Sequence, residues 1–340
     1  MCTNLSIFST EDSSTFAISA RAMEYEIDMN THVNVVPRGQ PFPPDNLLPP
    51  QNPLKWCNQY GYVGMEADFS TVFRGITDGI NEAGLSIGVL WFPCGEYPTS
   101  ETATNPVIYN INLAEWVLGN FDSVASLKNS INSITVVNIS ELYESARYPL
   151  HYVVSDSTGA NIIVEFMDGV LQVYDSTNGV MTNSPDYNWQ LNNLTNYVNL
   201  NLSDNPTEFW GQQLHGSGCL GMPGDATPPS RFVKAWMLQQ STQNYIPQNT
   251  EEAIALAARI ILAFSIPMGS TVLNDNTLLS TEWNVIRDQK DKVYYFLTGS
   301  NTNLFSVDLK AIDFNTVKAS SKPIAQPVWN TDITNDLINL

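Results

Sequence analysis

Few side chains in this sequence are suited to holding a metal ion. The candidates are four cysteines and three histidines: Cys2, Cys57, Cys94, Cys219, His32, His151 and His215. They are widely spaced, no two cysteines form a CxxC pair, and neither set has the spacing of zinc ligands. We therefore expect no metal and no cofactor. Four cysteines in 340 residues are also too few for a disulfide framework, although their spacing leaves open a bond such as Cys57 to Cys94.

Charged residues are scarce as well, and basic ones particularly so. They make up 14% of the chain, and 34 acidic residues against 15 basic ones give a formal net charge of −19 and a pI of about 4.3. Such a chain repels nucleic acids and anionic membrane surfaces, so we expect neither as a partner. It also repels anionic small molecules at long range. A substrate that carries a carboxylate would need arginines close to it.

Long apolar runs are missing too. No segment approaches the roughly 18 to 20 residues of a membrane-spanning helix, and no basic and apolar secretory signal precedes Cys2. As the sequence is written, we expect a cytoplasmic protein. If a signal peptide has been removed ahead of Cys2, a periplasmic or secreted location is expected instead.

Hydrophobic residues, at 43%, are as frequent as in ordinary globular proteins, and their periodicity predicts both strands and helices. Strands are predicted over 3–8, 15–21, 33–36, 72–77, 85–92, 151–155, 161–166, 170–174, 293–297 and 304–309. Helices are predicted over 107–118, from a cap at Asp122 through 131, and over 251–265 with Thr250 as the cap. This order predicts an α+β protein in which segregated helices cover the sheets, as one domain over 1–340.

Prolines are concentrated between residues 38 and 56, at positions 41, 43, 44, 49, 50 and 53. This density predicts a loop and argues against a helix or an inner strand. A long loop in a compact domain is more often functional than inert, so we expect the segment to form the rim of a pocket.

The N-terminal dipeptide has chemical potential. Removal of Met1, which a small second residue favours, would leave Cys2 with a thiol and a free α-amine. In small peptides these groups titrate near ~8.5 and ~8, so both can react near neutral pH. Alone, the dipeptide is read more simply as a start followed by a buried small residue. The predicted hairpin of 3–8 and 15–21, with a polar turn over 9–13, would place Arg21 beside Cys2.

Five motifs spread over the chain favour the reactive interpretation of the N-terminal dipeptide over the simpler one. They are Met1-Cys2-Thr3, Arg21-Ala-Met-Glu24, Asp78-Gly-Ile-Asn81-Glu-Ala-Gly84-Leu85, Thr182-Asn183-Ser184-Pro185, and Gly221-Met-Pro-Gly-Asp225-Ala-Thr-Pro-Pro-Ser-Arg231-Phe232. In this order and spacing the sequence resembles the choloylglycine hydrolase family, the linear-amide hydrolases that include bile salt hydrolases and penicillin V acylases. The resemblance implies the N-terminal-nucleophile (Ntn) hydrolase fold, a four-layer αββα sandwich.

The same resemblance assigns catalytic roles. It implies that Cys2 is the nucleophile and its freed amine the base, that Arg21 lies beside the thiolate, and that Asn183 is the oxyanion-hole amide. Arg231 resembles the second active-site arginine. Glu24 stands where the family usually has an Asp that hydrogen-bonds the N-terminal amine, and the extra methylene changes its reach. Without the family, Arg21, Asn183 and Arg231 would be read as a cap, a turn residue and a surface charge.

Trp91 is a second departure, because bile salt hydrolases commonly have Asn there and penicillin V acylases Tyr. A subset of the family from Gram-negative bacteria resembles this chain in having Trp, with an aromatic after the acid, as Tyr25 is here. Trp91 would then either donate its indole N–H to the oxyanion or wall the pocket. With Tyr25 it would form an aromatic slot for a phenoxy ring, a steroid edge or an acyl chain. The alternative is that both are plain core residues.

We therefore expect a cysteine Ntn amidohydrolase that cleaves linear amides of the conjugated bile salt or penicillin V type. The alternatives are an N-acyl homoserine lactone acylase of the same family and a non-catalytic binding protein on the same fold. The expected partner is a small-molecule amide. Relatives are often homotetramers, but the segment between Asn183 and Gly224 looks shorter than the one tetrameric members use for assembly, so the resemblance leaves the oligomeric state open.

Overall fold

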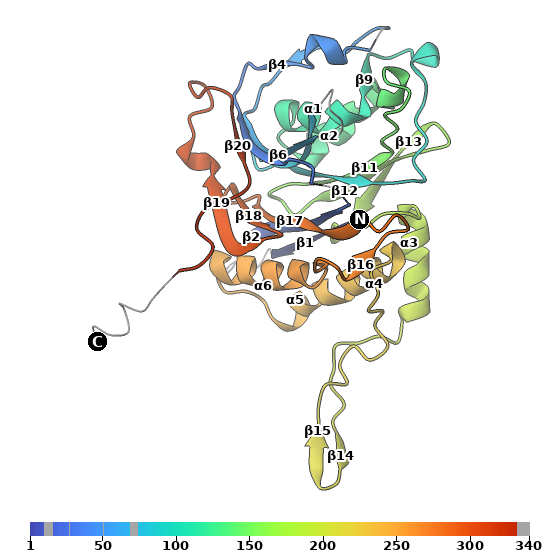
Figure 1. The fold of residues 1–340 in the computed structure, drawn as a ribbon, viewed down its shortest axis with the longest axis vertical. Helices are drawn as coiled ribbons and strands as arrows, with labels where there is room; N and C mark the ends of the chain where they lie inside the picture. The colour runs from blue at the N-terminus through green and yellow to red at the C-terminus, as the bar shows by residue number, and fades with distance from the viewer. Residues whose placement is uncertain (10–15, 27, 50, 69–73, 332–340) are drawn as a thin grey trace, which may run out of the picture.

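The computed structural model describes residues 1–340 except 10–15, 27, 50, 69–73 and 332–340. Two antiparallel sheets lie face to face in the centre, and helices cover the outer face of each sheet (Figure 1). These four layers confirm the predicted α+β class and the αββα sandwich.

The first sheet carries the N-terminus at its edge. Its strand order is β1-β2-β17-β18-β19, with β16 paired to β17. The bounds are β1 (Cys2–Ser9), β2 (Phe16–Tyr25), β16 (Thr271–Val272), β17 (Leu278–Asp288), β18 (Val293–Thr298) and β19 (Asn301–Asp308). The predicted first hairpin is present, with Cys2 opposite Met23 and Asn4 opposite Arg21. Its predicted turn lies mostly in residues 10–15, outside the described part of the chain.

The second sheet has the order β13-β12-β11-β8-β7-β6-β3-β20. Its strands are β3 (His32–Val36), β6 (Tyr62–Asp68), β7 (Arg74–Asn81), β8 (Ser86–Trp91), β11 (Leu150–Ser155), β12 (Asn161–Met167), β13 (Val170–Ser176) and β20 (Ser320–Pro323). The predicted meander over 151–174 is confirmed as β11, β12 and β13. The predicted strand over 72–77 is described from Arg74 onward.

Helices and short elements complete the layers. The helices are α1 (Leu113–Asn120), α2 (Val124–Ser130), α3 (Tyr187–Asn193), α4 (Pro228–Gln239), α5 (Ser241–Asn244) and α6 (Thr250–Leu262). The short strands are β4 (Pro41–Phe42), β5 (Trp56–Cys57), β9 (Val107–Tyr109), β10 (Thr135–Val137), β14 (Thr207–Phe209) and β15 (Gln212–Leu214). Single 3₁₀ turns are η1 (Asp45–Leu47), η2 (Ser100–Thr102), η3 (Asn110–Asn112), η4 (Ile131–Ser133), η5 (Ile139–Glu141), η6 (Leu194–Tyr197) and η7 (Leu309–Ala311). Among the described residues, no helix is both long and apolar enough to cross a membrane.

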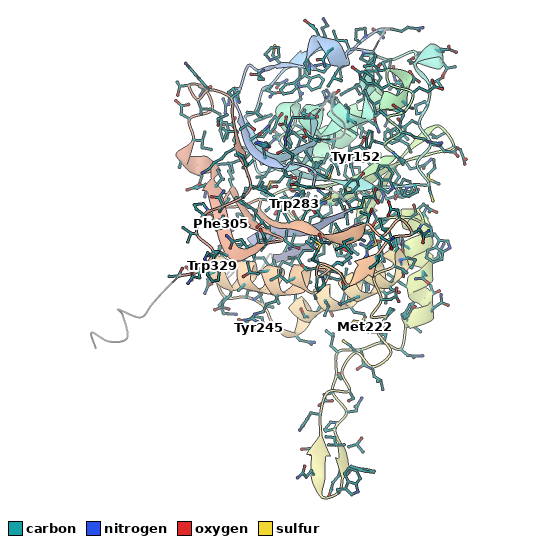
Figure 2. All side chains as sticks on the ribbon, in the orientation of Figure 1. Tyr152, Met222, Tyr245, Trp283, Phe305 and Trp329 are labelled. Atoms are coloured by element: carbon teal, nitrogen blue, oxygen red, sulfur yellow. The ribbon has the colours of Figure 1, made fainter. Side chains whose placement is uncertain are left out.

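Two hydrophobic cores hold the layers together. The first joins the facing sheets to α4 and α6 and contains Leu5, Leu90, Phe232 and Trp283. The second core fills the space between the second sheet, which contains β8 and β11, and the helices α1 and α2. Figure 2 labels Trp283 and Tyr152 inside the molecule, where both are fully buried. Each such large side chain contributes roughly 1.5–3 kcal/mol of transfer free energy, so the cores fix the position of the edge strand β1.

The predicted helix boundaries need three corrections. The helix predicted over 107–118 begins only at Leu113, because Val107–Tyr109 pairs in parallel with β10. Asp122 is not the cap of the next helix: the Ser123 hydroxyl accepts from the backbone N of Ser126 in a capping box. The third helix is capped by Asn249 rather than Thr250, and it ends at Leu262 rather than 265.

The proline-rich segment 38–56 is a loop, as predicted, and the regular structure in its described part is limited to the two-residue strands β4 and β5 and the single 3₁₀ turn η1. Its Phe42, Leu54 and Trp56 pack on the second core. The prediction that it forms a pocket rim is wrong for the cavity beside Cys2, which is lined by residues from other segments.

Candidate active site

Cys2 is the first residue of β1 and lies between the two sheets. Its side chain is 2% exposed. The Sγ atom is 3.3 Å from Arg21 Nη2 and 3.4 Å from the thioether sulfur of Met23. Leu5 and Ile7, fully buried further along β1, hold the strand in this register. The predicted proximity of Arg21 to Cys2 is therefore present in the fold.

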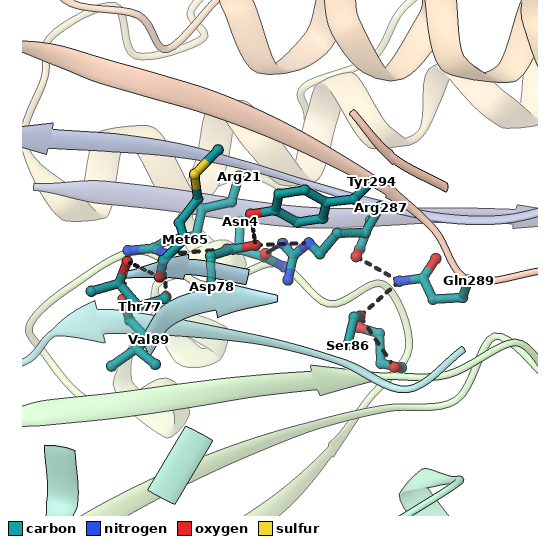
Figure 3. Close-up of polar contacts among 12 residues, drawn as sticks. Asn4, Arg21, Met65, Thr77, Asp78, Ser86, Val89, Arg287, Gln289 and Tyr294 are labelled. Carbon is teal, nitrogen blue, oxygen red and sulfur yellow. Dashed lines mark hydrogen bonds and ion pairs between the residues drawn. The ribbon is translucent and has the colours of Figure 1, made fainter. Parts of the chain in front are cut away.

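Arg21 is a fixed cation beside the sulfur. It is fully buried and donates to the carbonyl of Thr77 at 2.6 Å, to that of Val89 at 2.5 Å, and to Asp78 Oδ2 at 3.2 Å. Figure 3 shows these contacts. Burial alone would lower the pKa of Arg21, but the charges of Cys2 and Asp78 outweigh it, and the pKa is raised. A permanent positive charge next to a thiol favours the thiolate.

Asn183 and Arg231 meet at the backbone of Cys2. Asn183 Oδ1 accepts from the Cys2 backbone N at 3.0 Å and from Arg231 Nη2 at 2.7 Å. Because the oxygen faces two donors, the amide nitrogen is on the other side, where it donates to the Trp91 carbonyl at 2.6 Å. Arg231 also donates to the Cys2 carbonyl and to Thr3 Oγ1. Burial lowers the pKa of Arg231, partly opposed by Glu24 and Cys2.

A buried histidine holds the Asn183 segment. His151 Nε2 lies 3.1 Å from the Thr182 carbonyl, and its Nδ1 lies 3.0 Å from Glu165 Oε1. Phe92 stacks on the imidazole at 4.4 Å between ring centroids. Glu165 Oε2 in turn accepts from the Tyr187 backbone N at 3.1 Å. Sequence reasoning missed this pair, although the predicted hairpin of 151–155 and 161–166 carried the signal: two ionisable residues close together on adjacent strands.

Glu24 is fully buried and only partly satisfied. Its Oε1 accepts from Thr281 Oγ1 at 3.4 Å, and no described residue donates a hydrogen bond to Oε2. Burial raises the pKa of Glu24, opposed by the charges of Arg231, the N-terminal ammonium and Arg21. Its backbone pairs with Met1 in both directions, at 2.6 and 2.8 Å. With Met1 in place, the nitrogen of Cys2 is a peptide nitrogen.

A small cavity, of about 30 Å³, opens beside Cys2. Its wall is mainly apolar and aromatic, with Met23, Tyr25, Met29, Val89, Trp91, Tyr148 and Leu150, and Met1 also lines it. Trp91 packs edge-on against Tyr148 at 6.1 Å between ring centroids. Burial, and next Glu26, raise the pKa of Tyr25 to about 12, so its phenol is neutral near pH 7. Tyr25 and Trp91 are wall residues of this cavity.

All seven residues singled out in the sequence lie in or around this site. Cys2, Arg21, Asn183 and Arg231 form one chain of contacts, and Glu24, Tyr25 and Trp91 line the cavity. Trp91 contacts Asn183 through its carbonyl. The residues that support the site from behind, above all Asp78 and Arg287, were not singled out for chemistry, because nothing local in the sequence links them to Cys2.

In the described part of the chain, no group of three or more His, Cys, Asp or Glu residues could hold a metal ion. All four cysteines are free thiols, so Cys57 and Cys94 form no disulfide. The side chains that the site offers are a buried thiol, three arginines, an amide and two carboxylates.

Comparison with known proteins gives a consistent picture. Residues 2–322 match the family model described as linear amide C–N hydrolases, choloylglycine hydrolase family. The bile salt hydrolase/transferase of Clostridium perfringens is 29% identical over 330 residues, covering 94% of this chain and 96% of that protein. The penicillin V acylase of Pectobacterium atrosepticum is 31% identical over 314 residues, covering 88% and 78%.

Solved structures agree in fold. A variant of the conjugated bile acid hydrolase from Clostridium perfringens superposes with a TM-score of 0.84 at 25% identity, covering 98% of this chain and all of that chain. The penicillin V acylase from Agrobacterium tumefaciens superposes with a TM-score of 0.76 at 27% identity, covering 95% and 92%.

Proposed function

The chain belongs to the choloylglycine hydrolase family of linear amide C–N hydrolases, and from this premise we propose that it acts as a cysteine N-terminal-nucleophile amidohydrolase with Cys2 as the nucleophile. The family assignment itself makes the protein a hydrolase of carbon–nitrogen bonds other than peptide bonds, in linear amides. The observation that carries the proposal is the contact of Cys2 Sγ with the buried Arg21 at the edge of an apolar cavity.

The proposed base requires the loss of Met1. Its removal turns the peptide nitrogen of Cys2 into an α-amine, for which the Asn183 Oδ1 acceptor is already in place at 3.0 Å. It also frees both backbone groups of Glu24. Glu24 Oε2, to which no described residue donates a hydrogen bond, is then the group that stabilises the ammonium formed during the reaction, because an ion pair would compensate both buried charges.

The proposed reaction proceeds through a thioester. The Cys2 thiolate attacks the amide carbonyl, and the tetrahedral oxyanion is held by the second N–H of the Asn183 side chain, whose first N–H is bonded to Trp91. Such a donor contributes roughly 2.7–4 kcal/mol in comparable sites. The C–N bond then breaks, and the α-ammonium gives its proton to the leaving amine. Water attacks the thioester, the acid is released and the thiol is restored.

The apolar cavity supports an acyl group without charge. Conjugated bile salts and penicillin V both join such a group to an anionic amine-side product, which carries a carboxylate or, in taurine conjugates, a sulfonate. Arg21 and Arg231 supply a positive field for that charge. We rank these substrates first. N-acyl homoserine lactones share the apolar acyl group but lack the anionic group, and they are the alternative. A panel of glycine and taurine conjugates, penicillin V and acyl lactones, assayed for released amine, separates the classes.

A non-catalytic binding protein on the same fold makes the opposite prediction about the N-terminus. The enzyme requires Cys2 to be the first residue, so the intact mass must lack one methionine. Cys2→Ala should abolish amide hydrolysis and leave thermal unfolding unchanged, whereas Cys57→Ser, at an exposed thiol, should retain both. Retained hydrolysis by Cys2→Ala, or a mature chain that keeps Met1, would exclude the proposed mechanism.

We also propose that copies of the chain associate through a projecting arm. β14 and β15 form a hairpin that extends away from the sandwich (Figure 1). Its Phe209, Trp210 and Leu214 are 50%, 91% and 52% exposed. Monomeric soluble proteins rarely expose large apolar side chains grouped in this way. Trp210→Ser should shift the molar mass measured by light scattering toward the monomer. An unchanged oligomer, or a monomeric parent, would contradict this role.

A further inference from the structure

A second buried arginine lies behind the one that contacts the nucleophile. Arg287, on β17, is 1% exposed, and its Nε is 3.6 Å from Asp78 Oδ1, while Arg21 contacts the other oxygen of the same carboxylate at 3.2 Å. Tyr294 donates to Asp78 Oδ1 at 3.0 Å, and Arg287 Nη2 donates to Asn4 Oδ1 at 2.5 Å. Figure 3 shows Asp78 between the two guanidinium groups.

The charges in this cluster do not cancel. Two arginines share one carboxylate, and all three side chains are at most 1% exposed, so water does not screen the remaining positive charge. The Tyr294 phenol adds no compensating charge, because burial, and next the Asp78 carboxylate, keep its pKa well above the usual range. Glu24 is the other buried carboxylate near Cys2, and Arg231 lies close enough to oppose its burial. Three arginines therefore face two carboxylates around the nucleophile.

We propose that Arg287 is a positioning residue for the reaction: by sharing Asp78 with Arg21, it leaves an excess positive charge that Arg21 presents to the Cys2 sulfur, and the thiolate completes the charge balance of the buried cluster. This inference rests on the proposed role of Cys2 as the nucleophile. The carboxylate fixes the two guanidinium groups, and Arg21 Nη2 is the group that reaches Sγ.

A role in packing alone explains the arrangement less well. No described residue accepts a hydrogen bond from Arg287 Nε, and burial lowers the pKa of Arg287 despite the opposing charge of Asp78. Replacing a complete buried ion pair by apolar residues of similar volume is often neutral or stabilising, so such charges are weak evidence for a stabilising role. We therefore infer that the site uses the positive charge of Arg287.

Other charged or titratable groups face Cys2 from the elements around it. They are Glu24 and Tyr25 on β2, Arg231 on α4, Tyr148 in the segment before β11, and the N-terminal ammonium. The variants used in the test leave these groups unchanged. Arg287→Gln and Asp78→Asn each alter one charge, whereas Arg287→Lys and the double variant keep the original net charge.

The test measures the pH at which the Cys2 thiol becomes reactive. The full chain with Cys2 as its first residue is treated with iodoacetamide from pH 4 to 9, and the alkylation rate of the N-terminal peptide is followed by mass spectrometry. Arg287→Gln should move the pH midpoint upward by about one unit, since a nearby cation has been removed. Arg287→Lys should stay near the parent. The exposed Cys57 and Cys94 report in the same digests that the reagent behaves alike throughout.

The opposite charge change gives the sharpest control. Asp78→Asn should move the midpoint downward, and the double variant Arg287→Gln/Asp78→Asn should return it toward the parent value. Loosening of the core would instead shift the two single variants in the same direction and the double variant further, which would overturn the proposal. So would equal midpoints for Arg287→Gln, Arg287→Lys and the parent. If the parent thiol itself shows no thiolate reactivity, the proposed function fails with it, and no substrate is needed to tell these cases apart.

Discussion

Replacing Asn183 should separate catalysis from stability more clearly than any other change in the site. The side chain uses both of its ends: Oδ1 accepts from the Cys2 nitrogen and from Arg231, and the amide nitrogen is the proposed oxyanion donor. Asn183→Ala removes both functions. Asn183→Asp keeps an oxygen for Cys2 and Arg231 but has no N–H to donate.

The expected magnitudes differ for the two functions. Loss of one oxyanion donor should lower kcat by roughly 100- to 1,000-fold in both variants. Asn183→Ala should in addition lower the free energy of unfolding by about 1–3 kcal/mol, because Arg231 Nη2, 2.7 Å from the lost oxygen, keeps a buried donor without an acceptor. In Asn183→Asp that acceptor remains, although the second carboxylate oxygen faces the Trp91 carbonyl, so the loss of stability should be smaller than in Asn183→Ala.

The assay is amide hydrolysis by the mature chain, with urea unfolding followed on the same samples. A fall in kcat in both variants, with KM little changed, supports transition-state stabilisation. Two results would refute the reasoning: an Asn183→Asp variant with near-parent kcat, or a kcat that falls only in proportion to the lost stability.

Three further expectations concern single residues around the site. Burial raises the pKa of Glu115 to about 8, so the carboxyl group is neutral in the folded protein below that pH. The free energy of unfolding should therefore fall as the pH rises from about 4.5 to 8, by on the order of 4 kcal/mol at most. Glu115→Gln should remove this loss in urea titrations at pH 5 and 8. An equal pH dependence in both proteins would contradict it. Trp91→Ala should widen the cavity and shift kcat/KM toward bulkier acyl groups in a substrate panel, and an unchanged order of preference would exclude Trp91 as a wall of the acyl site. His151→Asn removes the contact with the Thr182 carbonyl and should lower kcat by roughly tenfold without a comparable change in KM, whereas unaltered kcat would show that Asn183 needs no such support.

The sequence supported predictions best where contacts are local. The hairpin that brings Arg21 to Cys2 joins neighbouring strands, so alternation of apolar residues was enough to place it. The start of the helix at Leu113 was missed because Val107–Tyr109 pairs with Thr135–Val137, and periodicity in one segment cannot report a strand that pairs elsewhere. The cap at Ser123 was missed by one residue, because Asp122 and Ser123 are both good capping residues.

Distant contacts were accessible only through the family resemblance, or not at all. Asn183 and Arg231 reach Cys2 across 181 and 229 residues, and their roles were inferred from motifs rather than from spacing. Asp78 lies in one of those motifs, yet its place between Arg21 and Arg287 depends on two sheets packing face to face. No local pattern encodes that packing.

The pairing of β2 with β17 has a consequence for how the protein is made. Glu24 and Thr281, which meet across these strands, are 257 residues apart, so the ribosome must synthesise most of the chain before the nucleophile strand can be enclosed. Throughout that interval the first thiol of the nascent polypeptide is accessible to oxidants and to other cysteines. Pairing between strands so far apart in the sequence is slow to form, so slow translation or slow folding lengthens the time for which this thiol is accessible.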